Sequence, residues 1–510
     1  MSILKSNNPS GPIVLVSAPM GANFPFSFGY LAAYLKQHNE KFIILFRDIP
    51  EKELVQKIID LKPLMVGFGN LYPELPIFKR YIELLNEAGR NFPIVIGGQM
   101  VSPIPEFAVN ITQADIGIIG EGEITLFKLA QAMREGNDLS EIKGLVIRDG
   151  EETMLTGPGE FIENLDDLPD VPFDIFPDNW LATGRWYAAY APRMLLRFTD
   201  RVIPVHGGRG CPYKCNFCYH HSKFRMRSVP LMMAEAEKNM EQFNGNVLNF
   251  SDDLAMVNPK RVRELVEHIA KLKKPIKYYM LGHFEVIAKL EDDLLKAMKE
   301  TGCRMIAQGF ESGSDRVLKL MGKRSTSDMI LTQVERLNKY GIYSTGNFMI
   351  GEISETREDV AETKRVMKEC VRIAPNTELT FSIVTPFPGS KLYSELFRRG
   401  LMKDDNEFYE RYMSMEGIFE WKVVANMSDM SDEEIIYLYK DMLDEYEKEK
   451  IRCLGKTMSA ICRAQVIAGQ VHLRLFKKNL NFLNCAPYRF AYDSFQKSLD
   501  CAKWKIRANH

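Results

Sequence analysis

The stretch GGRGCPYKCNFCYH at residues 207–220 is the most informative part of this sequence. It places Cys211, Cys215 and Cys218 at Cys-x3-Cys-x2-Cys spacing. Thiolates are the soft ligands that iron–sulfur clusters require, and Arg209 and Lys214 would offset part of the negative charge of a cluster. Because three thiolates hold only three corners of a four-iron cube, one iron would stay open to a substrate or a cofactor. The motif therefore predicts an iron–sulfur site with an open iron.

A structural zinc knuckle, completed by His220 or His221, is the alternative for the same cysteines. Zinc knuckles usually contain two ligand pairs bridged by a longer loop, and this motif lacks that arrangement. A disulfide suits the motif less well, because three cysteines so close together cannot all pair. The other six cysteines are scattered without a pairing rhythm, which indicates free thiols in a reducing compartment. They are Cys303, Cys370, Cys453, Cys462, Cys485 and Cys501.

Short apolar runs alternate with helix-like stretches from about residue 203 to residue 384, beginning just before the cysteine motif. Six such βα units predict an incomplete barrel rather than a closed barrel of eight strands. The candidate strands lie at 203–206, 246–250, 276–280, 304–308, 343–349 and 379–384.

The same alternation occurs in residues 12–135, where apolar runs of four or five residues read as buried parallel strands. The pattern predicts a doubly wound, Rossmann-like α/β domain that binds ligands at the carboxyl ends of its strands. Glycines at those ends permit a bulky ligand to approach the backbone, although turn geometry alone also explains a glycine there. The candidate residues at these ends are Gly97, Gly98, Gly120, Glu121 and Gly122.

Four segments follow from these patterns: an α/β domain at 1–150, a proline-containing linker at 151–200, the partial barrel at 201–395 and a helical C-terminal domain at 396–510. Residues 451–510 hold eleven Lys and Arg against two Asp. A solvated helical face is the usual meaning of such a tail, and peripheral contact with a membrane or another anionic partner is the alternative. We find no nucleic-acid motif, no membrane-spanning run and no secretory signal, so we expect a cytoplasmic protein.

The cysteine spacing with Phe217 resembles the signature of the radical S-adenosylmethionine enzymes. The fuller string RGCPYKCNFCYH is similar to the class B methylase-like subgroup, which carries an N-terminal cobalamin-binding domain. The resemblance implies that Cys211, Cys215 and Cys218 hold a 4Fe-4S cluster whose fourth iron takes the amino and carboxylate groups of S-adenosylmethionine. It also implies reductive cleavage to a 5′-deoxyadenosyl radical, with electrons from a donor such as flavodoxin or ferredoxin.

Further strings resemble the family's S-adenosylmethionine contacts at the carboxyl ends of the predicted strands. Each is weak by itself, because an Asp pair is usually a helix N-cap and a Pro-Phe-Pro-Gly string is usually a turn. Their order and spacing carry the resemblance. It implies that Asp252 and Asp253 lie near the methionine end, that Glu311 and Ser312 reach the ribose or the amino group, and that the turns of Gly351 and Pro386 cradle the adenine.

The N-terminal resemblance to the cobalamin-binding subgroup rests on residues 25–35, on Gly97 and Gly98, and on residues 120–123. Two departures stand out. The chain lacks the Asp-x-His-x-x-Gly string that supplies a histidine to cobalt in many cobalamin domains, and His38, the only histidine before residue 150, is predicted on a solvated helix face. The subgroup's GGPH-like string is replaced by Gly98-Gln99-Met100-Val101. A domain that kept the fold and lost cobalamin is therefore the alternative.

The resemblance implies methylation of an unactivated carbon in a small-molecule, lipid or natural-product substrate. One alternative is a cobalamin-dependent radical cyclase or oxidoreductase that forms tetrapyrrole or natural-product rings. Another is a non-catalytic iron–sulfur or zinc-binding module. The sequence names no substrate and no catalytic residue beyond the cofactor contacts.

Overall fold

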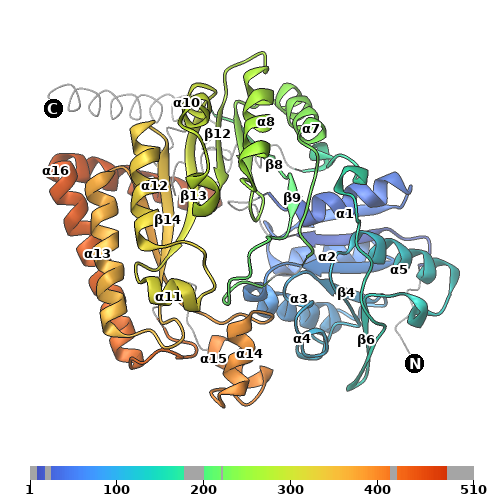
Figure 1. Cartoon of the computed structure of the whole chain (residues 1–510). Coiled ribbons are helices and arrows are strands. Elements are labelled where there is room, and N and C mark those ends of the chain that lie inside the picture. The colour runs from blue at the N-terminus through green and yellow to red at the C-terminus, as the bar shows by residue number, and fades with distance from the viewer. Residues whose placement is uncertain (1–7, 18–23, 177–199, 220–221, 414–421, 479–510) are drawn as a thin grey trace.

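The computed structural model describes residues 8–17, 24–176, 200–219, 222–413 and 422–478, with side chains described up to residue 455. Two mostly parallel sheets, each flanked by helices, lie side by side (Figure 1). The α/β fold class predicted from the sequence is confirmed. No helix among the described residues is long and apolar enough to cross a membrane.

The N-terminal sheet has seven strands in the order β2-β1-β3-β4-β5-β6-β7. Its first five strands are parallel, namely β1 (Ile13–Ser17), β2 (Phe42–Phe46), β3 (Met65–Gly69), β4 (Ile94–Gly97) and β5 (Ile116–Ile118). Strands β6 (Leu145–Asp149) and β7 (Glu152–Leu155) add an antiparallel hairpin, so the sheet continues into the stretch expected to be a linker. The strand order reverses at β1, where doubly wound folds bind ligands.

The helices of this domain bury apolar side chains against the sheet, whose strands contribute fully buried side chains such as Ile13, Val66 and Ile96. They are α1 (Phe26–Gln37), α2 (Glu51–Asp60), α3 (Leu75–Glu87), α4 (Pro105–Thr112) and α5 (Glu123–Glu135). Apolar runs between turn residues thus gave buried parallel strands, as the sequence predicted.

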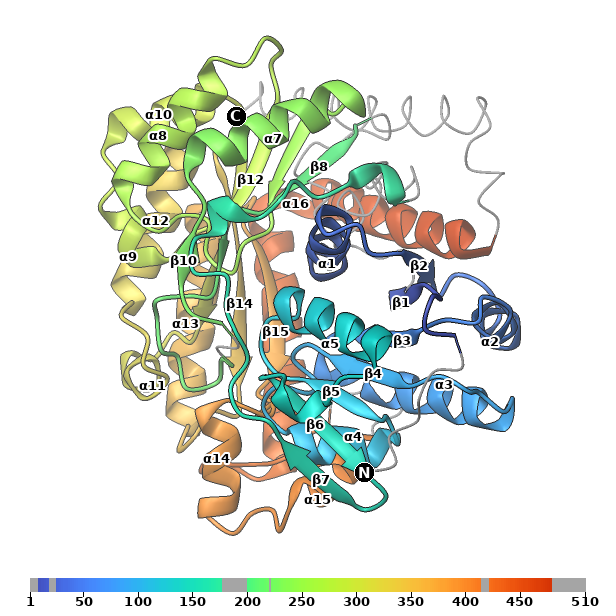
Figure 2. The same cartoon turned by 90° about the vertical axis from the view of Figure 1, so that its right-hand side faces the viewer.

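The second sheet has six parallel strands in the order β15-β14-β13-β12-β11-β8. The strands are β8 (Val202–Val205), β11 (Val247–Phe250), β12 (Lys277–Leu281), β13 (Cys303–Glu311), β14 (Tyr343–Ile350) and β15 (Glu378–Ile383). Because β8 and β15 lie at opposite edges, the sheet is an open six-stranded barrel, as predicted. Figure 2 shows β8 as the strand of this sheet nearest to α1.

The outer helices of the barrel follow its strands in chain order. They are α7 (Val229–Gln242), α8 (Pro259–Ala270), α9 (Phe284–Ala288), α10 (Asp292–Glu300), α11 (Asp315–Leu320), α12 (Ser327–Lys339) and α13 (Arg357–Ile373). A short antiparallel ribbon of β9 (Gly208–Arg209) and β10 (Arg225–Met226) brackets the cysteine motif. The motif is therefore a loop held at both ends, directly after the first barrel strand.

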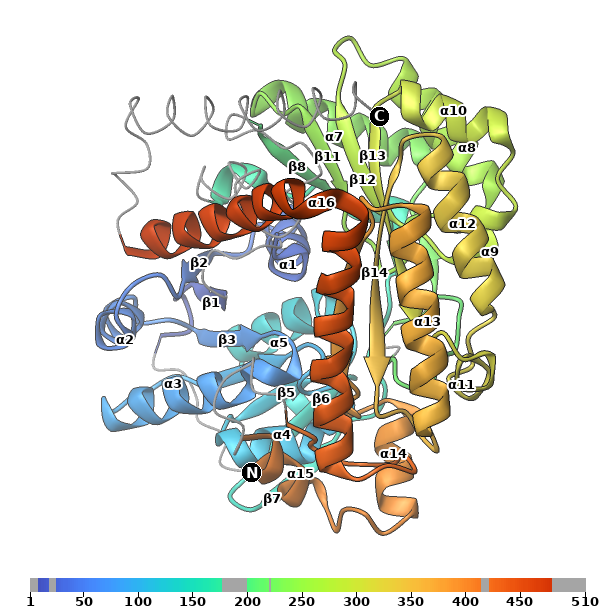
Figure 3. The ribbon, with the colours of Figure 1, turned by 90° about the vertical axis from the view of Figure 1, so that its left-hand side faces the viewer.

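The chain beyond the barrel is helical, as predicted, with α14 (Lys391–Arg398), α15 (Asp405–Met413) and α16 (Asp432–Lys478). Helix α16 lies beside α13 and then bends at Gly455, where φ is 76° (Figure 3). Four ion pairs join the two helices at a constant separation of 77 residues, which requires them to run parallel. The pairs are Arg357–Glu434, Lys364–Asp441, Lys368–Glu445 and Arg372–Glu449. Residues 479–510 of the basic tail lie outside the described residues.

Candidate functional site

The three motif cysteines lie together at the carboxyl end of the barrel, where the charge of Cys211 acts to raise the pKa of both Cys215 and Cys218. Cys215 is buried, Cys211 is partly buried and Cys218 is exposed as a residue, although its thiol is desolvated. Burial raises the pKa of Cys218 to about 12, and the neighbouring Cys215 charge adds to the effect. Burial likewise raises the pKa of Cys211 and of Cys215. The thiols thus favour their neutral form until a metal displaces the protons.

The described residues do not form a site for a single zinc ion. A structural zinc ion needs four ligands within about 2.0–2.3 Å of one centre. Among the residues that the structure describes, no group of three or more His, Cys, Asp and Glu is arranged to hold one metal ion. A four-iron cube offers a separate iron to each thiolate, so its ligands need no common centre. His220 and His221, which the zinc alternative requires, lie outside the described residues.

Asn216, between the second and third cysteines, anchors the loop to three other segments. Its side chain donates to Glu352 Oε1 at 2.8 Å, and its backbone N–H donates to the Met321 carbonyl at 2.9 Å. Its carbonyl accepts from the Leu392 N–H at 3.1 Å. Glu352 is fully buried just after β14, and burial raises its pKa. The sequence placed this glutamate in the turn after the strand but did not predict its partner, because nothing in its local sequence points to Asn216.

Lys323 is the cation that faces the cysteines. Its charge acts to lower the pKa of Cys211, Cys215 and Cys218 alike, against the larger effect of burial. It forms an ion pair of 3.2 Å with Glu311, whose backbone is left-handed with φ of 61°. Both side chains are about nine-tenths buried. The structure thus gives Lys323 the charge-offsetting position that the sequence analysis assigned to Arg209 and Lys214.

The two aspartates after β11 occupy different positions. Asp252 Oδ1 accepts the backbone N–H groups of Gly207 and Gly208 at 2.5 and 2.9 Å, and burial raises the Asp252 pKa to about 7. Asp252 therefore braces the segment that leads into the cysteine loop. Asp253 is exposed, and its charge contributes to the raised pKa of Cys211. Asp253 is thus the aspartate left accessible beside the cysteines.

The remaining predicted adenosine contacts also lie after their strands, and each is engaged in contacts within the fold. Ser312 Oγ is 3.1 Å from Thr363 Oγ1, and the Gly351 N–H donates to Glu355 at 2.6 Å. Pro386 is buried in the turn that ends at Gly389. That glycine has φ of 87°, and a Cβ there would lie 2.2 Å from the Tyr219 ring, so the turn packs directly against the residue after Cys218. These positions stay predictions as S-adenosylmethionine contacts.

His283 packs beneath the cysteine loop, just after β12. Its ring stacks on Tyr213 with centroids 3.8 Å apart and an interplanar angle of 13°. Its Nδ1 accepts the Glu285 N–H, so Nε2 carries the proton, and that buried atom has no hydrogen-bond partner among the described residues. Burial and the positive charge of Lys323 lower the His283 pKa to about 4.

The His283→Phe substitution should make stability less sensitive to acid. The folded protein protonates His283 only near pH 4, whereas the unfolded chain does so near pH 6.5, so acidification between these values favours unfolding. The phenyl ring keeps the stack on Tyr213 and removes a penalty of about 3 kcal/mol at the acid end. Melting temperatures measured at several pH values for both proteins should diverge below pH 6.5. Parallel curves would contradict the assignment.

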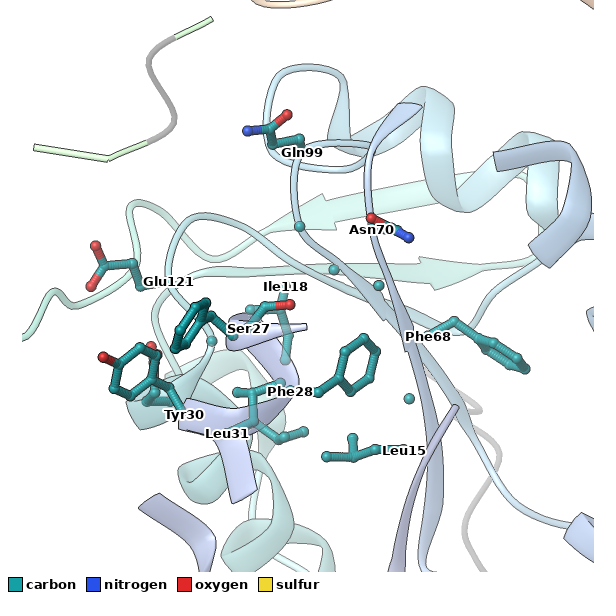
Figure 4. Close-up of a pocket in the computed structure, with 18 of the residues that line it drawn as sticks. Leu15, Ser27, Phe28, Tyr30, Leu31, Phe68, Asn70, Gln99, Ile118 and Glu121 are labelled. Carbon is teal, nitrogen blue, oxygen red and sulfur yellow. The ribbon is translucent and has the colours of Figure 1, made fainter. Parts of the chain in front are cut away.

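A cavity of about 300 Å³ lies at the carboxyl ends of β1, β3, β4 and β5 (Figure 4). All five glycine and glutamate residues predicted for this edge line it, namely Gly97, Gly98, Gly120, Glu121 and Gly122. Leu15, Phe28 and Leu31 form an apolar group within it, and Gln99 and Glu121 lie apart from that group. A Cβ at Gly97 or Gly120 would meet no atom closer than 3.8 Å, so it would make only ordinary van der Waals contacts with the protein. This glycine-lined, partly apolar cavity has room for part of a bulky cofactor such as cobalamin.

The barrel supplies two residues to this cavity, His206 and Arg209, and the sequence analysis assigned neither to it. Both belong to the segment that joins β8 to Cys211. His38, by contrast, is exposed at the end of α1, as predicted, with Nδ1 2.8 Å from the Tyr34 carbonyl oxygen. The histidine in the cavity wall therefore comes from the other domain.

A buried ion network, here called the clasp, joins the N-terminal domain to the ribbon around the cysteine loop. It comprises Glu121, Glu123, Arg209, Ser222 and Arg225. Arg209 donates to Glu121 at 2.7 Å and to Glu123 at 2.6 Å, and Arg225 and Ser222 also bind Glu121. The charged side chains are at most 11% exposed. Burial opposes ionisation of Glu121, but the hydrogen bond from Arg225 and the charge of Arg209 outweigh it and lower its pKa.

The comparisons with known proteins agree with both halves of the site. A model of the radical SAM superfamily matches residues 205–367, and a model of the B12 binding domain matches residues 13–130. The chain is 25% identical over 409 residues to the uncharacterized methyltransferase PH0819 of Pyrococcus horikoshii, covering 78% of this chain and 83% of that protein. It is 24% identical over 392 residues to the anaerobic magnesium-protoporphyrin IX monomethyl ester cyclase of Rubrivivax gelatinosus, covering 74% and 67%.

A solved structure shares the fold of this chain. It is the radical S-adenosylmethionine methyltransferase TsrM from Kitasatospora setae, with cobalamin and a [4Fe-4S] cluster bound. It matches with a TM-score of 0.61 at 16% identity, covering 76% of this chain and 75% of that chain, which shows a common fold. The cysteine loop, the cavity and both family models lead to one assignment: the chain belongs to the radical S-adenosylmethionine enzymes with an N-terminal cobalamin-binding domain, a family that uses a 4Fe-4S cluster, S-adenosylmethionine and cobalamin.

Proposed function

We propose that this protein methylates an unactivated carbon of a small-molecule or lipid substrate. The observation that carries the proposal is the wall shared by its two sites: His206 and Arg209 line the N-terminal cavity and precede Cys211 by only a few residues. When bound, the cluster with S-adenosylmethionine supplies radical chemistry, and cobalamin supplies a methyl group. Two such sites with a common wall suit transfer between them.

The chain's own residues would orient the groups and exclude water. Asp252 fixes the entry to the cysteine loop, Lys323 supplies the positive charge beside it, and the clasp holds the loop against the N-terminal domain. Leu15, Phe28 and Leu31 give the cavity an apolar interior. We assign Cys211, Cys215 and Cys218 to the cluster, Asp253 and Glu311 to S-adenosylmethionine, and the glycines of the cavity to cobalamin.

Radical cyclisation is the second candidate, since the chain is also similar to a protein named as a cyclase. The same site would serve it, because both reactions begin with hydrogen abstraction from the substrate. An electron donor such as flavodoxin or ferredoxin, and a peripheral membrane contact of the basic tail, belong to the proposal in either case.

The test is anaerobic turnover of the protein reconstituted with iron, sulfide and hydroxocobalamin. With a reductant, methyl-deuterated S-adenosylmethionine and metabolite or lipid extracts, we expect 5′-deoxyadenosine, S-adenosylhomocysteine and a product that carries the label. A product that loses hydrogen without gaining label would replace methylation by cyclisation. Failure to form any 5′-deoxyadenosine would leave only the non-catalytic binding module.

A further inference from the structure

Lys323 belongs to a short segment that packs directly against the cysteine loop. Asn216, between the second and third cysteines, donates its backbone N–H to the carbonyl of Met321 at 2.9 Å. Gly322 follows with φ of 75°, and a Cβ there would lie 3.2 Å from a backbone carbonyl oxygen of the loop and 3.9 Å from Cys215 Cα. A glycine in the left-handed region thus brings the backbone of residues 321–323 against the loop, and Lys323 is the next residue.

The Lys323 ammonium is buried at the carboxyl end of β13. Its side chain is 7% exposed, and its Nζ lies 3.2 Å from Oε1 of Glu311, the last residue of that strand. A Cβ at Gly309 would lie 2.1 Å from the same Glu311 oxygen and 2.8 Å from Nζ. The missing side chain at position 309 therefore leaves the space that this ion pair occupies.

The two charges of this pair act on the motif thiols with opposite signs. Burial raises the pKa of Cys211, Cys215 and Cys218, and the charge of Lys323 opposes that rise at each of them. The charge of Glu311 adds to the rise at Cys215 and Cys218. A positive and a negative group are thus within electrostatic reach of the same ligands.

Fixed charges beside a cluster bias its reduction. Reduction transfers one electron from an external low-potential donor, so the negative charge of the core increases by one while the thiolates stay bound. A nearby positive charge stabilises the more negative state, and a nearby negative charge destabilises it. The effect is large where burial limits screening by solvent and salt, and local charge is one of the factors that set cluster potentials.

We propose that Lys323 raises the reduction potential of the cluster held by the motif cysteines and that Glu311 lowers it, so that this ion pair sets how readily the cluster accepts an electron. The proposal rests on the assignment of the three cysteines to the cluster under the proposed function. It requires neither cobalamin nor a substrate, because both charges belong to the barrel.

The test is an anaerobic redox titration of the reconstituted full-length protein without S-adenosylmethionine, followed by electron paramagnetic resonance of the reduced cluster. Lys323→Met keeps most of the side-chain length and removes the charge. The equilibrium constant for reduction should fall about tenfold, a shift of about 59 mV for one electron. Lys323→Arg keeps the charge and should stay near the wild-type potential. Glu311→Gln removes the opposing charge and should raise the potential.

Lys364→Met is the matched control for the loss of one positive charge. Lys364 pairs with Asp441 where α13 lies beside α16, and both side chains are partly buried (Figure 3). Its potential should equal that of the wild type. The double variant Lys323→Met with Glu311→Gln loses both charges and should return toward the wild-type potential. Iron content, measured for every variant, reports whether the cluster is intact.

The outcomes are distinct. An unchanged or raised potential in Lys323→Met would overturn the proposal, and so would an equal fall in Lys364→Met. If Lys323→Met assembles no iron, Glu311→Gln decides alone, because a potential that does not rise would overturn the proposal. A wild-type protein that assembles no cluster would overturn the cluster assignment as well. The predicted shifts in a protein that methylates nothing would leave this proposal standing and remove only the proposed reaction.

Discussion

Replacing Cys211, Cys215 or Cys218 by alanine is expected to remove the cluster and abolish 5′-deoxyadenosine formation. Each thiolate holds one corner of the cube, and no other described Cys, His, Asp or Glu is arranged with them to take over. Iron analysis should give about four irons per wild-type chain and far fewer in each variant. The loss should exceed that from any other single substitution, because the radical chemistry depends wholly on the cluster.

Cys453→Ala is the matched control for this prediction. Cys453 is partly buried on α16, away from the cysteine loop. Its replacement should leave iron content and 5′-deoxyadenosine formation unchanged. Wild-type turnover in any of the three motif variants would remove the basis of the assignment, and equal loss in Cys453→Ala would show that thiol removal acts through stability alone.

Glu121→Gln is expected to produce the largest loss of stability among the charge-neutralising substitutions considered. Glu121 compensates Arg209 and Arg225 in a nearly dry environment, and its amide replacement leaves both guanidinium groups with less negative charge. Breaking a buried ion pair by removing one partner costs about 3–5 kcal/mol. Because the clasp forms a wall of the cavity, cobalamin affinity should fall together with the melting temperature.

Glu160→Gln provides the comparison for the clasp. Glu160 pairs with Lys128 at 2.5 Å, but the two side chains are 48% and 45% exposed. Exposed pairs contribute about 0–1 kcal/mol, so calorimetry should show little change. The loss of stability in Glu123→Gln should lie between those of Glu121→Gln and Glu160→Gln, since Arg209 is the one clasp cation that Glu123 binds. Equal stability of Glu121→Gln and Glu160→Gln would show that the clasp adds nothing to the fold.

Local sequence patterns were sufficient to predict the features that depend on short segments of the chain. The spacing of the three cysteines fits one loop, and the apolar runs between turn residues gave the parallel strands of both sheets. Because parallel strands end at a common edge, Gly97, Gly98 and Gly120 could be placed together before any contact was known. Both strands of the hairpin, β6 and β7, were missed, because no strand was predicted between residues 135 and 203, and the residues of β7 are half exposed and lack the apolar run of a buried strand.

The pairings across the chain could not be predicted in this way. Arg209 lies 88 residues from Glu121, and Asn216 lies 136 residues from Glu352. A charged or amide side chain carries no periodic signal that identifies its partner, so the sequence suggested that Arg209 serves the cluster, and the structure places it in the clasp. Lys323 was overlooked for the same reason.

The sequence by itself determined the cluster motif, because the type and spacing of its three cysteine ligands are properties of one short segment, and the resemblance of its motifs to a known family implied S-adenosylmethionine and cobalamin. Only the tertiary structure decided how the two sites meet: His206 reaches the N-terminal cavity, Lys323 reaches the cysteines, and the clasp locks the domains. Those contacts form between segments that are far apart in the chain. Charged groups and rings that are buried together there become specific partners.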